Sequence, residues 1–183
     1  MERDLVSDTF PIGSELPQFS LPNIDGKSLG SDYLKGGKAG VVVFSCNHCP
    51  YVKGSDAAMI EVANRFQEKG VRFVSISSND AVQYPEDSFE KMKVKAEAMS
   101  LPFPYLYDES QQVAKSFDAA CTPEVYVFDD QQKLVFHGTI NNSPRFSNEV
   151  TQHYLAVALE QILAGKEPTP AFVHPIGCSI KWR

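Results

Sequence analysis

Residues 39–50 of the chain read AGVVVFSCNHCP, and this stretch decides the fold. Its first seven residues are almost all small, apolar or β-branched, without the alternation of a half-exposed strand, so they predict a strand buried on both faces of a sheet. Pro50 suits the first turn of a helix, where its missing N–H and fixed φ are favourable. Two cysteines, Cys46 and Cys49, therefore lie where a buried strand gives way to a helix.

Similar patterns predict the remaining elements. Strands are expected at residues 16–21, 71–77, 103–107, 124–128 and 133–140, with an Asp25-Gly26 hairpin turn after the first. Helices are expected to begin at Pro50, Pro85, Asp108 and Asn148, each burying one apolar face. Only short loops separate these elements, so residues 1–183 predict a single α/β domain with a central mixed sheet flanked by helices.

The composition excludes several classes of function. The 183 residues are 43% hydrophobic and 22% charged, as in ordinary globular proteins. The net charge is −6 and Lys and Arg form no large cluster, so neither nucleic acid nor a membrane surface is an expected partner. Apolar runs reach only about four residues, too short for a membrane span. The first ten residues carry four charges and no apolar signal-peptide core, so we expect a cytoplasmic protein.

The close pair of cysteines predicts redox chemistry. Four cysteines in 183 residues are too few for a disulfide scaffold, and in a reducing compartment a close pair is more often catalytic or metal-binding. We expect both thiols on the first turn of the helix. Cys46, nearer the helix start, would meet unpaired N–H groups and attack as a thiolate, and Cys49 would resolve the mixed disulfide. His48 would add positive charge beside Cys46 and make the pair more oxidising.

Other interpretations of the cysteines stay open. The pair could be half of a zinc site with His48 as a ligand, although Cys121 and Cys178 do not form the second pair that a structural site needs. In that case, or if the cysteines sense oxidation, the protein would be a binding or regulatory module. Cys121 is either a third redox thiol or a small buried apolar residue. Cys178 is either a resolving partner, if the C-terminal tail folds back over the pair, or a packing residue.

Several segments of the chain, in order, resemble the thioredoxin superfamily. Residues 13–22, followed by Asp25-Gly26, resemble the start of its redoxin branch, which includes TlpA-like and peroxiredoxin-like (AhpC/TSA-like) proteins. Residues 44–52 and 121–124 resemble the active site of that branch. The ending at residues 177–182 matches the tail of a peroxiredoxin-like group.

The resemblance implies a thioredoxin fold with an N-terminal extension (residues 1–38), an insertion around residues 80–107 and a C-terminal tail (residues 166–183). It also implies a cis peptide bond between Thr122 and Pro123, with Pro123 facing the cysteine pair and helping to hold the substrate strand. The implied activity is that of a thiol–disulfide oxidoreductase. It would act on a disulfide- or thiol-containing protein or small molecule, with an external reductant or oxidant and no cofactor or metal.

The sequence departs from the active-site motifs of both peroxiredoxins and thioredoxins. If Cys49 takes the place of the peroxidatic cysteine, Val42 stands where peroxiredoxins have a proline and Cys46 where they have a threonine. An atypical thiol-dependent peroxidase is therefore the alternative activity. Gly40 stands where thioredoxins have a buried acid, so no proton acceptor for Cys49 is visible in the sequence.

The tail is predicted to pack on the domain rather than to extend into water. It contains apolar side chains whose burial is worth about 1.5–3 kcal/mol each, and Trp182 is the expected anchor. We expect it to carry Cys178 within disulfide range of one of the other three cysteines.

Overall fold

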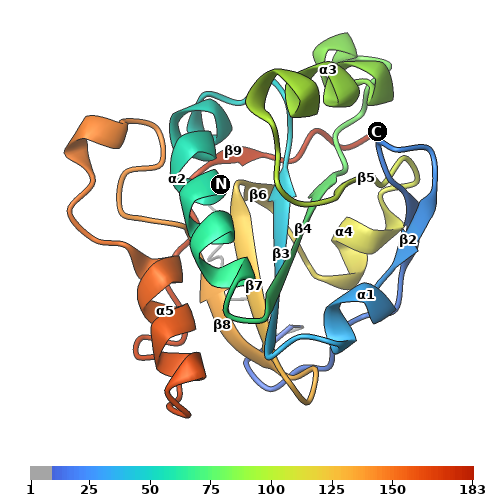
Figure 1. The fold of residues 1–183 in the computed structure, drawn as a ribbon. Coiled ribbons are helices and arrows are strands. Elements are labelled where there is room, and N and C mark those ends of the chain that lie inside the picture. Colours follow the sequence, from blue (N-terminus) through green and yellow to red (C-terminus); the bar gives the residue numbers. More distant parts are fainter. Residues whose placement is uncertain (1–9) are drawn as a thin grey trace.

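The structure is a computed structural model that describes residues 10–183, and a five-stranded mixed sheet lies at its centre (Figure 1). The strands, in the order in which they lie side by side, are β5 (Tyr105–Tyr107), β4 (Val71–Ser77), β3 (Ala39–Ser45), β7 (Glu124–Asp129) and β8 (Leu134–Gly138). β3, β4 and β5 are parallel, whereas β7 is antiparallel to both of its neighbours. The predicted α/β class and mixed sheet are confirmed.

Helices cover both faces of this sheet (Figure 1). They are α1 (Asp32–Lys35), α2 (Pro50–Gln67), α3 (Phe89–Met99), α4 (Gln112–Ser116) and α5 (Tyr154–Leu163). Val41 and Val43 of β3 pack against α2 and α5, and Val42 and Phe44 pack against α1 and α4 on the opposite face. All seven residues of β3 are buried, so the apolar run predicted both its strand and its central position.

The N-terminal extension packs onto the core through its described part, and the first nine residues lie outside the described range. It forms a hairpin of β1 (Ser20–Pro22) and β2 (Ser28–Gly30) around the predicted turn, where Gly26 has a φ of +84°. The strand predicted at residues 16–21 is wrong in extent, because only Ser20–Pro22 has a paired neighbour strand. Leu16 and Phe19 are nevertheless buried in the core.

The predicted insertion contains a 3₁₀ turn, η1 (Pro85–Asp87), followed by α3 and β5. Ser88 caps the N-terminus of α3, and its side-chain oxygen accepts a hydrogen bond from the Lys91 N–H at 3.3 Å. Helix α3 thus starts at Phe89, four residues after the predicted Pro85.

The last helix also begins later than predicted. Asn148 falls in a single 3₁₀ turn, η2 (Ser147–Glu149), and α5 starts at Tyr154. Between them, the side-chain oxygen of Asn142 accepts the N–H groups of Thr151 and Gln152 at 2.9 and 3.0 Å. Because these N–H groups are held by a side chain, the local backbone does not continue as a helix.

The tail packs on the domain as predicted. Its strand β9 (Cys178–Ser179) pairs antiparallel with β6 (Cys121–Thr122), the short strand before β7. Ile180 is 3% exposed within the core, whereas Trp182 is 40% exposed, so the anchor is Ile180 and the prediction of Trp182 is wrong. Among residues 10–183 no helix is both long and apolar enough to span a membrane.

The core on the α4 face is testable through Phe117. This ring is fully buried and lies 5.2 Å from the rings of Phe44 and Tyr126. We expect Phe117→Ala to lower the free energy of unfolding by about 3–5 kcal/mol, measured by urea denaturation. Phe146→Ala, at a ring that is 50% exposed, is the matched control and should cost less than about 1 kcal/mol. Equal losses in both variants would contradict this description of the core.

Candidate active site

Pro50 determines where α2 begins. A proline ring disfavours helical conformation in the preceding residue, and Cys49 is extended, with φ −64° and ψ 129°. Cys49 is therefore the capping residue of α2, and Cys46 lies just beyond the end of β3. The prediction that both thiols lie on the first helical turn is wrong, because the proline keeps Cys49 and the residues before it out of the helix.

The surroundings of Cys49 favour the thiolate form of its side chain. Its pKa is lowered to about 4, chiefly because the Cys46 thiol donates a hydrogen bond to its sulfur. Burial opposes the shift, and the Cys178 thiol and the N–H groups of Val52 and Cys178 reinforce it. Val52 lies in the first turn of α2, where unpaired N–H groups and the helix dipole favour an anion.

Cys46, by contrast, keeps its proton. Its pKa is raised because it donates to Cys49, because it is buried and because Asp87 places negative charge nearby. We expected Cys46 to be the more exposed thiol with the lower pKa. Both expectations are wrong: Cys46 is fully buried, Cys49 is 1% exposed, and their pKa values shift in the opposite sense.

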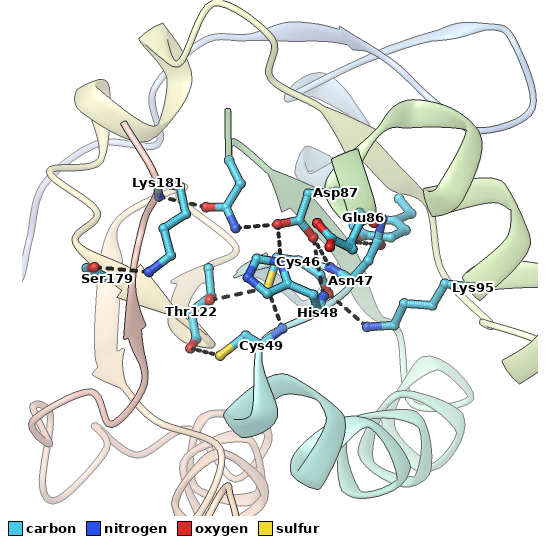
Figure 2. A network of polar contacts seen from close by, with 12 residues as sticks. Cys46, Asn47, His48, Cys49, Glu86, Asp87, Lys95, Thr122, Ser179 and Lys181 are labelled. Atoms are coloured by element: carbon cyan, nitrogen blue, oxygen red, sulfur yellow. Dashed lines mark hydrogen bonds and ion pairs between the residues drawn. The ribbon is translucent and has the colours of Figure 1, made fainter. Parts of the chain in front are cut away.

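Thr122, at the end of the short strand β6, contacts both thiols (Figure 2). Its Oγ1 lies 3.5 Å from the Cys46 sulfur, and its carbonyl oxygen accepts from the neutral Cys49 thiol at 3.4 Å. The Cys49 N–H donates to the Cys46 sulfur at 3.3 Å. The Thr122–Pro123 peptide bond is cis, as predicted. The structure therefore brings the two sequence motifs together.

His48 lies beside a buried carboxylate next to Cys46 (Figure 2). Its Nδ1 is 2.5 Å from Asp87 Oδ2, although the two groups are not aligned as a hydrogen bond. The other Asp87 oxygen accepts the Asn47 N–H at 2.7 Å, and Asn79 donates to Oδ2 at 2.8 Å. Sequence reasoning missed Asp87, which is 40 residues from Asn47 and comes from the insertion.

The same residues are the candidate metal ligands among residues 10–183. Ligand atoms of Cys46, His48 and Asp87 lie within 4.8 Å of one another. A set of three ligands with an open position is typical of catalytic zinc. Both Asp87 oxygens already accept hydrogen bonds from protein groups, so a bound ion would compete with Asn47 and Asn79 for this carboxylate.

Lys95 joins α3 to the cysteine loop. Its Nζ donates to the Cys46 carbonyl at 2.9 Å and lies 3.1 Å from an oxygen of Asp56 on α2. Burial raises the pKa of Asp56, against the attraction of Lys95. A partly buried acid, Asp56, therefore lies near the pair, on α2 rather than at Gly40 on β3. Neither member of this ion pair was predicted.

The two remaining cysteines have different surroundings. Cys121 is buried, and burial together with the charge of Glu124 raises its pKa. Its thiol donates to Glu124, which also accepts the Cys121 N–H at 3.1 Å. Cys178 is partly exposed and packs against Cys46 and Cys49. Burial and hydrogen bonding to Cys49 raise the pKa of Cys178 to about 11. All four thiols are free in this structure.

Comparison with known proteins identifies the family. Residues 12–137 match the model of the AhpC/TSA family, which is more than half of the chain, so the chain belongs to this family. It is 30% identical over 105 residues to the chloroplastic peroxiredoxin Q of Oryza sativa subsp. japonica. That match covers 57% of the chain and spans 45% of the length of this curated relative.

Two solved structures are similar over almost the whole chain. An uncharacterized conserved protein from Geobacillus kaustophilus is 46% identical, with a TM-score of 0.91 and coverage of 97% of this chain and 95% of that chain. A hypothetical protein from Sinorhizobium meliloti 1021 is 35% identical, with a TM-score of 0.90 and coverage of 95% and 96%.

More distant structures confirm the predicted thioredoxin fold. The thioredoxin domain of a thiol-disulfide oxidoreductase from Bacteroides vulgatus is 20% identical, with a TM-score of 0.60 over 70% of this chain and 88% of that chain. Peroxidoxin BcpB from Mycobacterium tuberculosis is also 20% identical, with a TM-score of 0.62 over 85% and 95%. The expected place in the redoxin branch of the thioredoxin superfamily is therefore confirmed.

The hydrogen bond from Cys46 can be tested by titrating Cys49. Cys46→Ala removes this donor, whereas Cys46→Ser keeps a hydroxyl in its place. We expect the pKa of Cys49 to rise in the alanine variant and to stay low in the serine variant. The measurement is thiolate absorbance near 240 nm, followed from about pH 3 to about pH 10.

The sign of the titration follows from the depressed pKa. Since the pKa of Cys49 falls from 9.0 to about 4, the thiolate signal should be complete at neutral pH and vanish as the pH falls through about 4. Cys49→Ser should abolish the signal at neutral pH. A signal that persists in Cys49→Ser would show that another thiol carries the charge.

Proposed function

We propose that the protein is a thiol–disulfide oxidoreductase in which Cys49 is the attacking thiol. The observation that carries this proposal is the position of Cys49 at the N-cap of α2, packed in one cluster with Cys46 and Cys178, where the pKa of its thiol is lowered. The thiolate is the nucleophile in disulfide exchange, so a site that holds one at neutral pH is suited to this reaction. The proposal reverses the roles that the sequence predicted for Cys46 and Cys49.

The reaction has two exchange steps. The Cys49 thiolate attacks one sulfur of a disulfide substrate, forms a mixed disulfide and releases the other substrate sulfur as a thiolate. A second thiol of the protein then attacks the Cys49 sulfur, which closes an internal disulfide and releases the rest of the substrate. The CxxC spacing makes Cys46 a candidate for this second thiol. An external dithiol then reduces the internal disulfide, so electrons pass from that donor to the substrate.

His48 and Pro123 have supporting roles in this proposal. The His48 side chain is 29% exposed, and its ring nitrogen lies within 4.8 Å of the Cys46 sulfur and an Asp87 oxygen, so it forms part of the polar edge of the site. Pro123 follows Thr122, the residue that contacts both thiols, and shapes the surface on which a substrate segment would lie. The partners would be disulfide- or thiol-containing molecules in a reducing compartment such as the cytoplasm.

The comparisons support the same chemistry. One protein of the same fold is described as a thiol-disulfide oxidoreductase and another as a peroxidoxin, and both are 20% identical to this chain. Family membership also favours a second candidate, a thiol-dependent peroxidase. There the Cys49 thiolate would attack a peroxide oxygen, forming a sulfenic acid and releasing water or an alcohol. Zinc analysis of the purified protein tests the third interpretation, a metal-holding module at Cys46, His48 and Asp87.

Turnover of a protein disulfide tests the proposal. With insulin as substrate and dithiothreitol as electron donor, Cys49→Ser should lose activity by about 100-fold or more, since no attacking thiolate remains. Cys121→Ser is the matched control, because its thiol bonds to Glu124, and it should stay within about twofold of the parent protein. Consumption of hydrogen peroxide with the same donor, at rates exceeding insulin reduction, would favour the peroxidase.

The double variant Cys46→Ser with Cys178→Ser provides a second readout. Without either thiol that contacts Cys49, the mixed disulfide cannot be resolved and should accumulate, to be detected by mass spectrometry. Undiminished insulin reduction by Cys49→Ser would contradict the proposed mechanism.

A further inference from the structure

The C-terminal tail runs from the β8 side of the sheet, past α2, toward the side on which β5 lies (Figure 1). It first runs beside β8, where the His137 carbonyl accepts the Val173 N–H at 3.0 Å. It then pairs with β6 through β9. Beyond β9, the Lys181 N–H donates to the Asn79 side chain at 2.9 Å, and Lys181 accepts the Asp80 N–H at 2.8 Å. The tail is therefore attached on both sides of the site.

The register of this pairing places a cysteine directly at the attacking thiol. Cys178 lies opposite Thr122, the residue whose carbonyl oxygen meets the Cys49 sulfur. Cys178 packs against the same small cluster that contains Cys46 and Cys49. An extended segment added to the edge of a short strand is also how many proteins bind a peptide. The tail thus presents Cys178 to Cys49 as an extended peptide would.

Gly177 permits this close approach. A Cβ added at this position would overlap the carbonyl group of Thr122, which is backbone and cannot move aside as a side chain would. Only glycine lets the tail lie flat against the Thr122–Pro123 loop. The position therefore offers a way to displace β9 without altering any thiol.

We infer that Cys178, rather than Cys46, is the thiol that resolves the mixed disulfide at Cys49. This inference rests on the proposed function and assigns the second thiol that it requires. The tail is also the part of the site that can move, because β9 and β6 pair through two residues each. Movement of the tail admits a substrate to the buried Cys49, and its return brings Cys178 to the mixed disulfide.

The surroundings of the two candidates favour Cys178 once Cys49 has reacted. Cys178 is partly exposed and packs against the cluster that holds Cys49, so its thiol can reach both solvent and the Cys49 sulfur. Cys46 is fully buried, and its sulfur already contacts the Thr122 hydroxyl and the Cys49 N–H.

The resolving step is a second exchange. The Cys178 thiol loses its proton to solvent and its sulfur attacks the Cys49 sulfur. The bond between Cys49 and the substrate sulfur breaks, the bond between Cys49 and Cys178 forms, and the substrate leaves as a thiolate that takes up a proton. The internal disulfide would hold the tail over the site until an external dithiol reduces it.

A two-phase reaction with 5,5′-dithiobis(2-nitrobenzoate) tests this inference on the full chain. Attack by Cys49 releases about one equivalent of the coloured thiolate, and resolution releases about a second one. With one equivalent of reagent, we expect Cys178→Ser to keep the first phase and slow the second by about tenfold or more, whereas Cys46→Ser keeps both. Peptide mapping of the oxidised parent protein should find Cys49 linked to Cys178.

Two further variants separate the role of the thiol from that of the strand. Gly177→Ala should slow the second phase although all four cysteines remain, because the added methyl displaces β9 from Thr122. Ser179→Ala, at the exposed neighbouring position, should behave like the parent protein. A second phase that survives in Cys178→Ser and is lost in Cys46→Ser would overturn the inference and leave the proposed function intact. If the Cys49→Ser variant retains both phases, that result would instead contradict the proposed function.

Discussion

The site depends on where α2 can begin, and Pro50 fixes that point. Because proline keeps the preceding residue extended, Cys49 is the N-cap residue of the helix and lies beside the unpaired N–H groups of its first turn. The buried strand β3 ends at Ser45, so the loop between them must turn within Cys46–Cys49 and place one thiol against the other. The opposite pKa shifts of the two cysteines follow from this geometry, since one is the hydrogen-bond donor and the other the acceptor.

Two later parts of the chain, the insertion and the C-terminal tail, contribute further residues to the site at the start of α2. The insertion supplies Asp87, whose charge keeps Cys46 protonated, and Lys95, which binds the Cys46 carbonyl. The tail supplies Cys178 and is connected to the insertion through Asn79, which accepts from the Lys181 N–H and donates to Asp87. A displacement of the tail would therefore change the hydrogen bonding of the Asp87 carboxylate beside Cys46. The insertion and the C-terminal tail, which are additions to the thioredoxin fold, therefore contribute side chains to the site itself.

Features that depend on local sequence pattern could be predicted from the sequence, whereas contacts made by residues from distant segments could not. The apolar run at residues 39–45 predicted β3, and the Thr122–Pro123 motif predicted the loop that faces the pair. The expectation of both thiols on the first helical turn failed because Pro50 keeps Cys49 extended and outside the helix. Asp87 and Asp56 carry no local motif, and only tertiary packing places them near the thiols. Asn148 looked like a helix start, yet Asn142 holds the following N–H groups outside α5.

The central claim is that Cys49 holds the thiolate and therefore attacks. Its most direct test is brief alkylation of the reduced full-length protein with iodoacetamide at about pH 6, where a thiol of ordinary pKa is almost entirely protonated, followed by mass spectrometry of the peptides. The account predicts that Cys49 is labelled first, ahead of the more exposed Cys178. First labelling of Cys46, with Cys49 unmodified, would contradict it.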